Sequence, residues 1–470
     1  MDITMKTAEA VGLPEKERQT LSRLLRLYKS HAGKNAEKRR YYEGAVTLGD
    51  VNLGLAIPKS VRNLSIGCAW GEKAVDVLAA RSMFDGYVGE NGETVDALKR
   101  ITDANQLVSS YARACRNELT YGCSFATLSA DPVIGCRIRF HSPEDGAAEW
   151  DGEKERIGDG FVVSGLVTTE DGHTKPAELQ LHTDDAVWII HRGADDSDWH
   201  AEAMPHMMGR PLMEPFIWNA TASKPLGRSR LKYAVRQLIN GYVRTVANAT
   251  IGLEFATSPQ KYLLGLTDEQ YDAVINQKFR TYVGSILAST VNPETGEKPT
   301  FGQLAQGSIE PHVQMLRMLS TQFSAATGLT VTDVGVVNDA NPTSSDAILA
   351  QSQTLIVSAE QLNAGNTRAL YNIAQMAMAI AANVRPEALS DEQKNIVPHF
   401  KNPAMPSVGV TADAAIKIAS AREGFASTDV FLEMIGFDQA DIRRIKAQEQ
   451  RSRGLALIGD LAEEETDDDQ

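Results

Sequence analysis

The stretch NPTSSDAILAQSQTLIVSAEQLNAGNTRALYNIAQMAMAIAA, residues 341–382, decides most of the fold. Thr343, with Asp346 three residues later, forms an N-cap of the capping-box type. Steps of four and three residues then give one mostly apolar stripe: Ile348, Ser352, Leu355, Ala359, Leu362, Asn366, Ala369, Ile373, Met376 and Ile380. The pattern predicts a single helix about 60 Å long, at about 1.5 Å per residue. Gly365, near its middle, is expected to allow a kink.

Other helical patterns flank this stretch. Apolar residues at steps of three and four predict a helix over residues 229–255, which ends before Pro259, and a shorter one over 309–327, which ends at Gly328. Residues 329–341 have no helical signal and predict a loop. Beyond the long helix, residues 411–455 are again helical in pattern and lead into an acidic end.

The first half of the chain predicts an α+β arrangement. Helices are expected over residues 15–40, 61–81 and 107–121, the first with its apolar side formed by Leu21, Leu24, Leu25 and Leu27. Between residues 124 and 220, short β-type runs such as AVWIIHR alternate with turns such as Glu170-Asp171-Gly172. This alternation is typical of an antiparallel sheet.

Composition limits the function classes. The 470 residues contain 47 Lys+Arg and 61 Asp+Glu, a net charge of −14, which argues against a protein that grips duplex DNA by counter-ion release. Residues 460–470 hold seven acids and no base, so the other 459 residues carry 47 − 54 = −7. The N-terminal sequence has no signal-peptide pattern, and the most apolar stretch, 374–384, is too short to span a bilayer. We therefore expect a soluble protein without a membrane partner.

The sequence contains few signs of a catalytic or ligand-binding site. It has no P-loop, no G-x-G-x-x-G after a strand, no H-E-x-x-H and no G-x-S-x-G; the segment Gly122-Cys123-Ser124-Phe125-Ala126 lacks the closing glycine and predicts a tight packing corner. Imidazoles and carboxylates that could bind a divalent metal gather at His191, Asp195, Asp196, Asp198, His200 and His206, but their spacing fits no ligand template. We expect an exposed loop there, no metal and no cofactor.

The cysteines and the arginines point to structural roles. The cysteines Cys68, Cys115, Cys123 and Cys136 form no C-x-x-C pair and lie in apolar or strand-like surroundings, which predicts buried free thiols in a reducing compartment. The most noticeable basic groups are Arg39, Arg40, Arg228 and Arg230, for which salt bridges on a helix surface or subunit interface are favoured over nucleic-acid contacts.

The order of short motifs resembles that of the portal (head–tail connector) proteins of tailed bacteriophages, specifically the SPP1-type portal family. The matching stretches are residues 41–44 (YYEG), 69–70 (AW) followed by 75–81 (VDVLAAR), 105–107 (NQL), 118–125 (ELTYGCSF), 225–230 (PLGRSR), 258–265 (SPQKYLLG), 326–329 (ATGL) and 341–348 (NPTSSDAI). Each motif alone is weak. Together they cover residues 41–420 in the right order, which is fairly specific.

The resemblance implies a non-enzymatic virion protein. Such proteins form a homo-oligomeric ring, usually a dodecamer, at one vertex of the capsid, assembled in the host cytoplasm. Double-stranded DNA passes through the axial channel in packaging and ejection without sequence specificity. The partners implied are the terminase large subunit, a head-completion or adaptor protein, and the major capsid and scaffolding proteins.

Carried onto this chain, the portal fold divides it into a wing (residues 1–227), a stem helix (228–257), a clip (258–306), a second stem helix (307–328), a tunnel loop (329–342), a long kinked wing helix with a late wing segment (343–410), and an α-helical crown with the acidic tail (411–470). The tunnel-loop residues expected to line the DNA channel are Thr332, Asp333, Val334, Val336, Val337, Asn338 and Asp339. This loop has no Lys or Arg, which suits a conduit because each neutralised phosphate would hold the DNA back.

Two alternatives stay open on the sequence. One is another virion structural or scaffold protein built on helix packing. The other, from a different class, is a metal-dependent hydrolase centred on His191, Asp196, His200 and His206.

Overall fold

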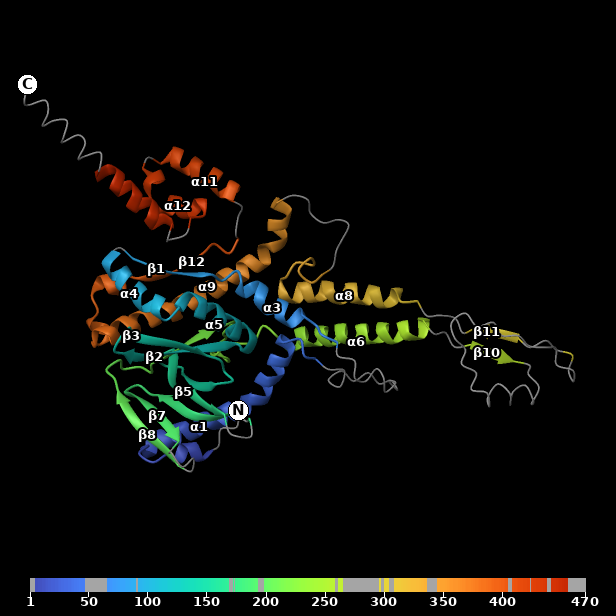
Figure 1. Cartoon of the computed structure of the whole chain (residues 1–470), viewed down its shortest axis with the longest axis horizontal. Helices are drawn as coiled ribbons and strands as arrows, with labels where there is room; N and C mark the ends of the chain where they lie inside the picture. Colours follow the sequence, from blue (N-terminus) through green and yellow to red (C-terminus); the bar gives the residue numbers. More distant parts are fainter. Residues whose placement is uncertain are drawn as a thin grey trace, which may run out of the picture.

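The computed structural model describes residues 5–46, 66–89, 92–168, 172, 174–192, 198–257, 261–264, 296, 300–303, 308–335, 345–404, 408–422, 424–437 and 441–454. These residues combine helices with antiparallel strands, so the predicted α+β class is confirmed. A mixed helix and sheet body occupies one end of the molecule, and a pair of antiparallel helices, α6 and α8, projects from it (Figure 1).

The body contains a three-stranded and a five-stranded antiparallel sheet, as the alternating pattern predicts. In the smaller sheet, β2 (Cys123–Asp131) lies between β3 (Gly135–His141) and β9 (Met213–Ile217). The larger sheet has its five strands in sequence order: β4 (Gly146–Asp151), β5 (Arg156–Thr168), β6 (Thr174–His182), β7 (Ala186–Arg192) and β8 (Trp199–Pro205). Neighbouring strands that follow one another along the chain need only short turns, which explains the many Asp and Gly turns.

Helix α1 (Glu15–Tyr42) covers one face of the larger sheet. Its predicted apolar side is confirmed: Leu21, Leu24 and Leu25 are fully buried and pack with Phe161 and Leu181. The helix ends at the predicted YYEG motif, where Gly44 adopts the left-handed conformation that glycine reaches at low cost.

The remaining helices of the first half are α3 (Trp70–Ala79), α4 (Gly92–Ala104) and α5 (Leu107–Tyr121). The α5 bounds match the prediction. The helix predicted over 61–81 is shorter at its start, because residues 66–69 are not helical and Ala69 is the N-cap of α3; residues 61–65 lie outside the described residues.

Helix α9 (Ser345–Ala382) is the predicted long helix. Its stripe is confirmed from Ser352 to Met376, with Leu355, Leu362 and Ile373 almost completely buried. It runs against β2, β3 and β9, and its second half is buried on most sides (Figure 1). The first turns of α9 stand at an angle to the rest in Figure 1. A Cβ on Gly365 would meet only Ile217 O, at 3.8 Å, so close packing does not require glycine there.

The chain after α9 returns to the body and then ends in short helices. Strand β12 (Val397–Phe400) pairs with β1 (Phe84–Val88), a contact between segments about 300 residues apart that the sequence pattern does not predict. Helices η3 (Pro386–Ala388) and α10 (Asp391–Lys394) lie between α9 and β12. The helical pattern predicted over 411–455 corresponds to α11 (Val408–Ala421), α12 (Asp429–Ile435) and a helix over residues 441–454.

A buried polar network joins α5 to α9. The Asn366 amide donates hydrogen bonds to the Glu118 carboxyl (2.9 Å) and to the Tyr111 hydroxyl (2.9 Å), and Tyr111 shares a hydrogen bond with Ser82 (2.6 Å). Glu118 is fully buried, and its Oε1 has no hydrogen-bond partner among the described residues. Burial raises the pKa of Glu118 to about 8, against an ordinary value of 4.5.

This network predicts a pH-dependent stability. Between pH 4.5 and pH 8 the unfolded chain has released the Glu118 proton while the folded chain keeps it, so the group makes folding less favourable as pH rises. The free energy of unfolding should fall by about 1.4 kcal/mol per pH unit relative to Glu118→Gln, which has no proton to lose. Urea unfolding at pH 5 to 8 measures the difference. Glu72→Gln, at an exposed position, serves as control, and parallel curves for wild type and Glu118→Gln would contradict the assignment.

Candidate functional site

The most distinctive feature of the molecule is the projecting pair of helices, α6 (Tyr233–Thr257) and α8 (Glu310–Thr327), which we call the stem pair. The helices run antiparallel to each other, and the hairpin of β10 (Lys261–Leu264) and β11 (Thr300–Gln303) lies at their far end (Figure 1). Both helices were predicted, but α6 begins four residues later than expected. The reason is that Ser229 Oγ donates to Thr120 O and accepts from the Leu231 amide, which holds the preceding residues as a non-helical link.

Close contact along one seam holds the stem pair together. A Cβ on Gly241 of α6 would lie 3.1 Å from Leu319 Cδ2 of α8, so glycine lets the helices approach closely. On the α8 side, Leu319 and Phe323 lie one turn apart, and both are buried. Small residues facing large ones are how two antiparallel helices interlock.

Trp70, the first residue of α3, anchors the stem pair to the body. Its ring lies 4.5 Å from the Tyr242 ring of α6 and 4.7 Å from the Phe323 ring of α8, and only 6% of its surface is exposed. One aromatic side chain therefore contacts both stem helices where they meet the body. The Ala69-Trp70 motif that contributes to the family resemblance lies at this contact.

Arg230 forms a second anchor, which the sequence did not identify correctly. Its guanidinium donates to Ala74 O in α3 and to Thr327 O, the last carbonyl of α8. The residue is 8% exposed, and burial lowers its pKa to about 10. The predicted surface salt bridge is therefore wrong for Arg230, because backbone carbonyls and the negative end of α8 take the place of a carboxylate. Arg39 does pair with Glu144, at 3.5 Å.

Beyond Glu310 in its first turn, the face of α8 opposite its buried side has a central row without charged residues. Its buried face holds Leu319, Ser320 and Phe323. At steps of four and three on the other side lie four exposed residues, Gln314, Met318, Thr321 and Ala325. We call this row the uncharged stripe. The only basic side chain exposed next to it is Arg317.

The loop after α8 contains the first of the predicted channel residues. Gly328 ends the helix in the left-handed conformation, and residues 331–335 form turns. The Asp333 carboxylate accepts hydrogen bonds from the Thr330 amide (3.0 Å) and the Thr330 hydroxyl (2.8 Å), so it closes its own turn. Thr332 is exposed and Val334 is buried. The other predicted residues, Val336, Val337, Asn338 and Asp339, lie outside the described residues.

The hydrolase alternative gains no site from the part of the chain that the structure describes. His191 and His200 lie opposite each other on β7 and β8. Among the described residues, no three or more His, Cys, Asp or Glu side chains are placed so that they could hold a metal ion. Asp198 and His206 belong to the described residues, whereas Asp195 and Asp196 lie outside them. Ser124 Oγ is buried and donates to Ala114 O (2.9 Å), as expected of a packing corner. All four cysteines are buried and free, as predicted.

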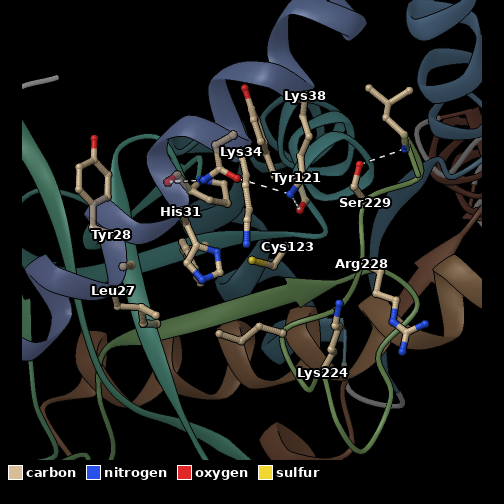
Figure 2. Close-up of a pocket in the computed structure, with 18 of the residues that line it drawn as sticks. Leu27, Tyr28, His31, Lys34, Lys38, Tyr121, Cys123, Lys224, Arg228 and Ser229 are labelled. Carbon is tan, nitrogen blue, oxygen red and sulfur yellow. Dashed lines mark hydrogen bonds between the residues drawn. The ribbon is translucent and has the colours of Figure 1, made fainter. Parts of the chain in front are cut away.

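One pocket was not predicted. It has a volume of about 560 Å³ and lies between α1, the first residues of β2 and β4, and the segment 224–236 that leads into α6 (Figure 2). We call it the basic pocket, because its lining includes Lys34, Lys38, Lys224, Arg228, Lys232 and Arg236. These residues come from two stretches nearly 190 positions apart in the sequence, and no local charge run announces them.

Comparisons with known proteins identify structural neighbours only. No protein-family model and no curated protein matches the chain. Among solved structures it is similar to a chain of "Virion of native gene transfer agent (GTA) particle", with a TM-score of 0.46 and 11% identity over 86% of this chain and 93% of that one. Two others are chains of "Neck of empty GTA particle computed with C6 symmetry" (TM-score 0.44, 13% identity, 79% and 90% covered) and "Neck of native GTA particle computed with C12 symmetry" (TM-score 0.41, 13% identity, 78% and 89% covered). Among the described residues, no helix combines the length and apolarity needed to cross a membrane.

Proposed function

We propose that the chain is a portal-type subunit of a phage-like virion, which assembles into a closed ring and conducts double-stranded DNA through the axis. The uncharged stripe of α8 carries this proposal. If α8 lines the channel, the duplex meets Gln314, Met318, Thr321 and Ala325, none of which neutralises a phosphate. A conduit needs such a surface, because every added cation contact strengthens DNA binding and slows its movement.

The apolar surface of the stem pair supports a ring. Apolar side chains remain exposed on both helices: Tyr233 (71%) and Leu253 (46%) on α6, and Met315 (40%) on α8. A projecting pair with apolar outer surfaces needs neighbours at its sides. Copies arranged side by side around an axis supply those neighbours through one repeated heterologous contact, which closes as a ring.

The remaining roles rest on the family resemblance. In this proposal the β10–β11 hairpin belongs to the clip, at the end of the stem that terminase and a head-completion protein would reach. Residues 329–342 form the tunnel loop, and the ring has twelve copies at one capsid vertex. The anchors Trp70 and Arg230 then connect the stem to a wing that packs against neighbouring subunits.

A lysine on the uncharged stripe tests the channel assignment. In Thr321→Lys every subunit would place a cation on the channel wall, and the amount of DNA packaged should fall on the order of tenfold while ring formation is unchanged. Gln237→Lys adds the same charge at an exposed position of α6 and should package like the wild type. Packaged DNA per particle is the measurement. Normal packaging by Thr321→Lys would remove α8 from the channel.

A further inference from the structure

The basic pocket is electrostatically unusual for this protein. Six full positive charges line it, no lining residue is acidic, and the whole chain carries a net charge of −14. His31 adds an imidazole, and Figure 2 shows His31, Lys34 and Cys123 directed into the same space. Uncompensated cations at this density repel one another, so the pocket is built to receive negative charge.

Most of these cations lack a carboxylate partner. Lys34, Lys224 and Lys232 form no ion pair with any residue that the structure describes. Lys38 Nζ donates to Tyr121 O (2.7 Å), and burial together with Arg236 and Lys34 lowers the pKa of Lys38. Arg236 has a partial partner in Glu37, at 3.6 Å. The positive charges around the pocket are therefore available to pair with negative groups of a ligand.

The walls between the cations are apolar. Leu27, Phe125, Ala147, Leu226 and Leu231 line the pocket, so the ligand must present apolar surface as well as negative charge. The volume of about 560 Å³ suits a few side chains or a short run of chain. Inorganic phosphate would fill only a small part of it and leave the apolar walls uncovered.

The cations are also spread out rather than focused on one point. Lys34 and Lys38 lie on one face of α1. Lys224, Arg228 and Lys232 lie in the segment before α6, and Arg236 lies in the first turn of α6. From Leu27 to Lys38 the lining of α1 extends about 16 Å at 1.5 Å per residue. An extended ligand with several negative groups matches this spread.

We propose that the basic pocket docks a segment of a partner protein that combines Asp and Glu with apolar side chains. Charge complementarity and apolar walls together favour such a segment over nucleic acid, whose backbone offers phosphates without apolar side chains. The acidic end of this chain has suitable chemistry, but the last described helices, around α11 and α12, lie across the body from α1 (Figure 1). The occupant is therefore assigned to another protein. The proposal holds whether or not the chain forms a ring.

A peptide titration on the assembled full-length protein tests it. The probe is a fluorescent peptide with the sequence of residues 455–470, LALIGDLAEEETDDDQ, chosen because it joins apolar and acidic residues. We expect saturable binding in fluorescence anisotropy, and at least a tenfold weaker Kd in the double variant Lys34→Glu, Lys224→Glu. Lys175→Glu, an exposed lysine of β6 away from the pocket, should bind as the wild type does.

A second arm leaves the protein unchanged. The same peptide with its acids replaced by Asn and Gln should not bind, and a peptide of glutamates without apolar residues should bind at least tenfold more weakly than the probe. No saturable binding, or binding unaffected by the double variant, would overturn the proposal. Tighter binding of a single-stranded oligonucleotide at these lysines would also overturn it, in favour of a nucleic-acid site.

Discussion

Replacing Gly71 with alanine is expected to lower the free energy of unfolding by about 3 kcal/mol or more. A Cβ at this position would lie 1.9 Å from Tyr41 O and 2.7 Å from Tyr41 C, which are backbone atoms at the end of α1 and cannot rotate away. The first turn of α3 would have to move. Because Trp70 is the adjacent residue and contacts both stem helices, that movement would also loosen the stem pair from the body.

Gly33 supplies a matched control. It lies inside α1, and a Cβ there would meet no atom within 4 Å. Gly33→Ala should therefore stabilise the protein by about 0.5–1 kcal/mol, because alanine is the better helix former. Chemical denaturation of the two variants should give shifts of opposite sign. Equal shifts, or a change below about 1 kcal/mol for Gly71→Ala, would contradict the close approach of α1 and α3.

The second large effect is expected from Arg230→Met, which keeps much of the side-chain volume but removes the donors. Thr327 O, at the end of α8, would lose its buried partner, and Ala74 O would lose its second one. Hydrogen bonds from a charged group contribute about 1.5–3 kcal/mol each, so a loss of about 3 kcal/mol is expected. Near-ultraviolet circular dichroism should change as well, since Trp70, Tyr242 and Phe323 pack beside this anchor.

Arg228→Met is the control for that variant. Arg228 is exposed, and its guanidinium donates to Thr221 Oγ1 at 3.2 Å, within the same loop. Its replacement should change stability by no more than about 0.5 kcal/mol. If Arg230→Met were equally harmless, Arg230 would not connect the stem pair to the body.

Helices with a strong period were predictable from the sequence. The stripe of α9 and the apolar side of α1 depend on spacing within one segment, and local spacing is what a sequence displays directly. The antiparallel sheets were predictable as a class because short alternating runs are separated by turns. Their strand order, and the β1–β12 pair formed by residues about 300 positions apart, depend on contacts that no local pattern encodes.

The site was less predictable, because its side chains act through distant partners. From the sequence, Arg230 is predicted to form a salt bridge on a helix surface or subunit interface. Only the packing of α3 and α8 shows that its guanidinium donates hydrogen bonds to two backbone carbonyls. The channel role of Asp333 stays a prediction; the sequence did not show that its carboxylate also closes a turn with Thr330. The uncharged stripe, by contrast, follows from local spacing, because Gln314, Met318, Thr321 and Ala325 recur at steps of four and three.

Electron microscopy of the purified full-length protein tests the central proposal most directly. The account predicts closed rings with an axial hole, with α8 and its uncharged stripe nearest the axis and α6 outside it. A monomer, an open filament, or a ring in which α8 lies away from the axis would contradict it.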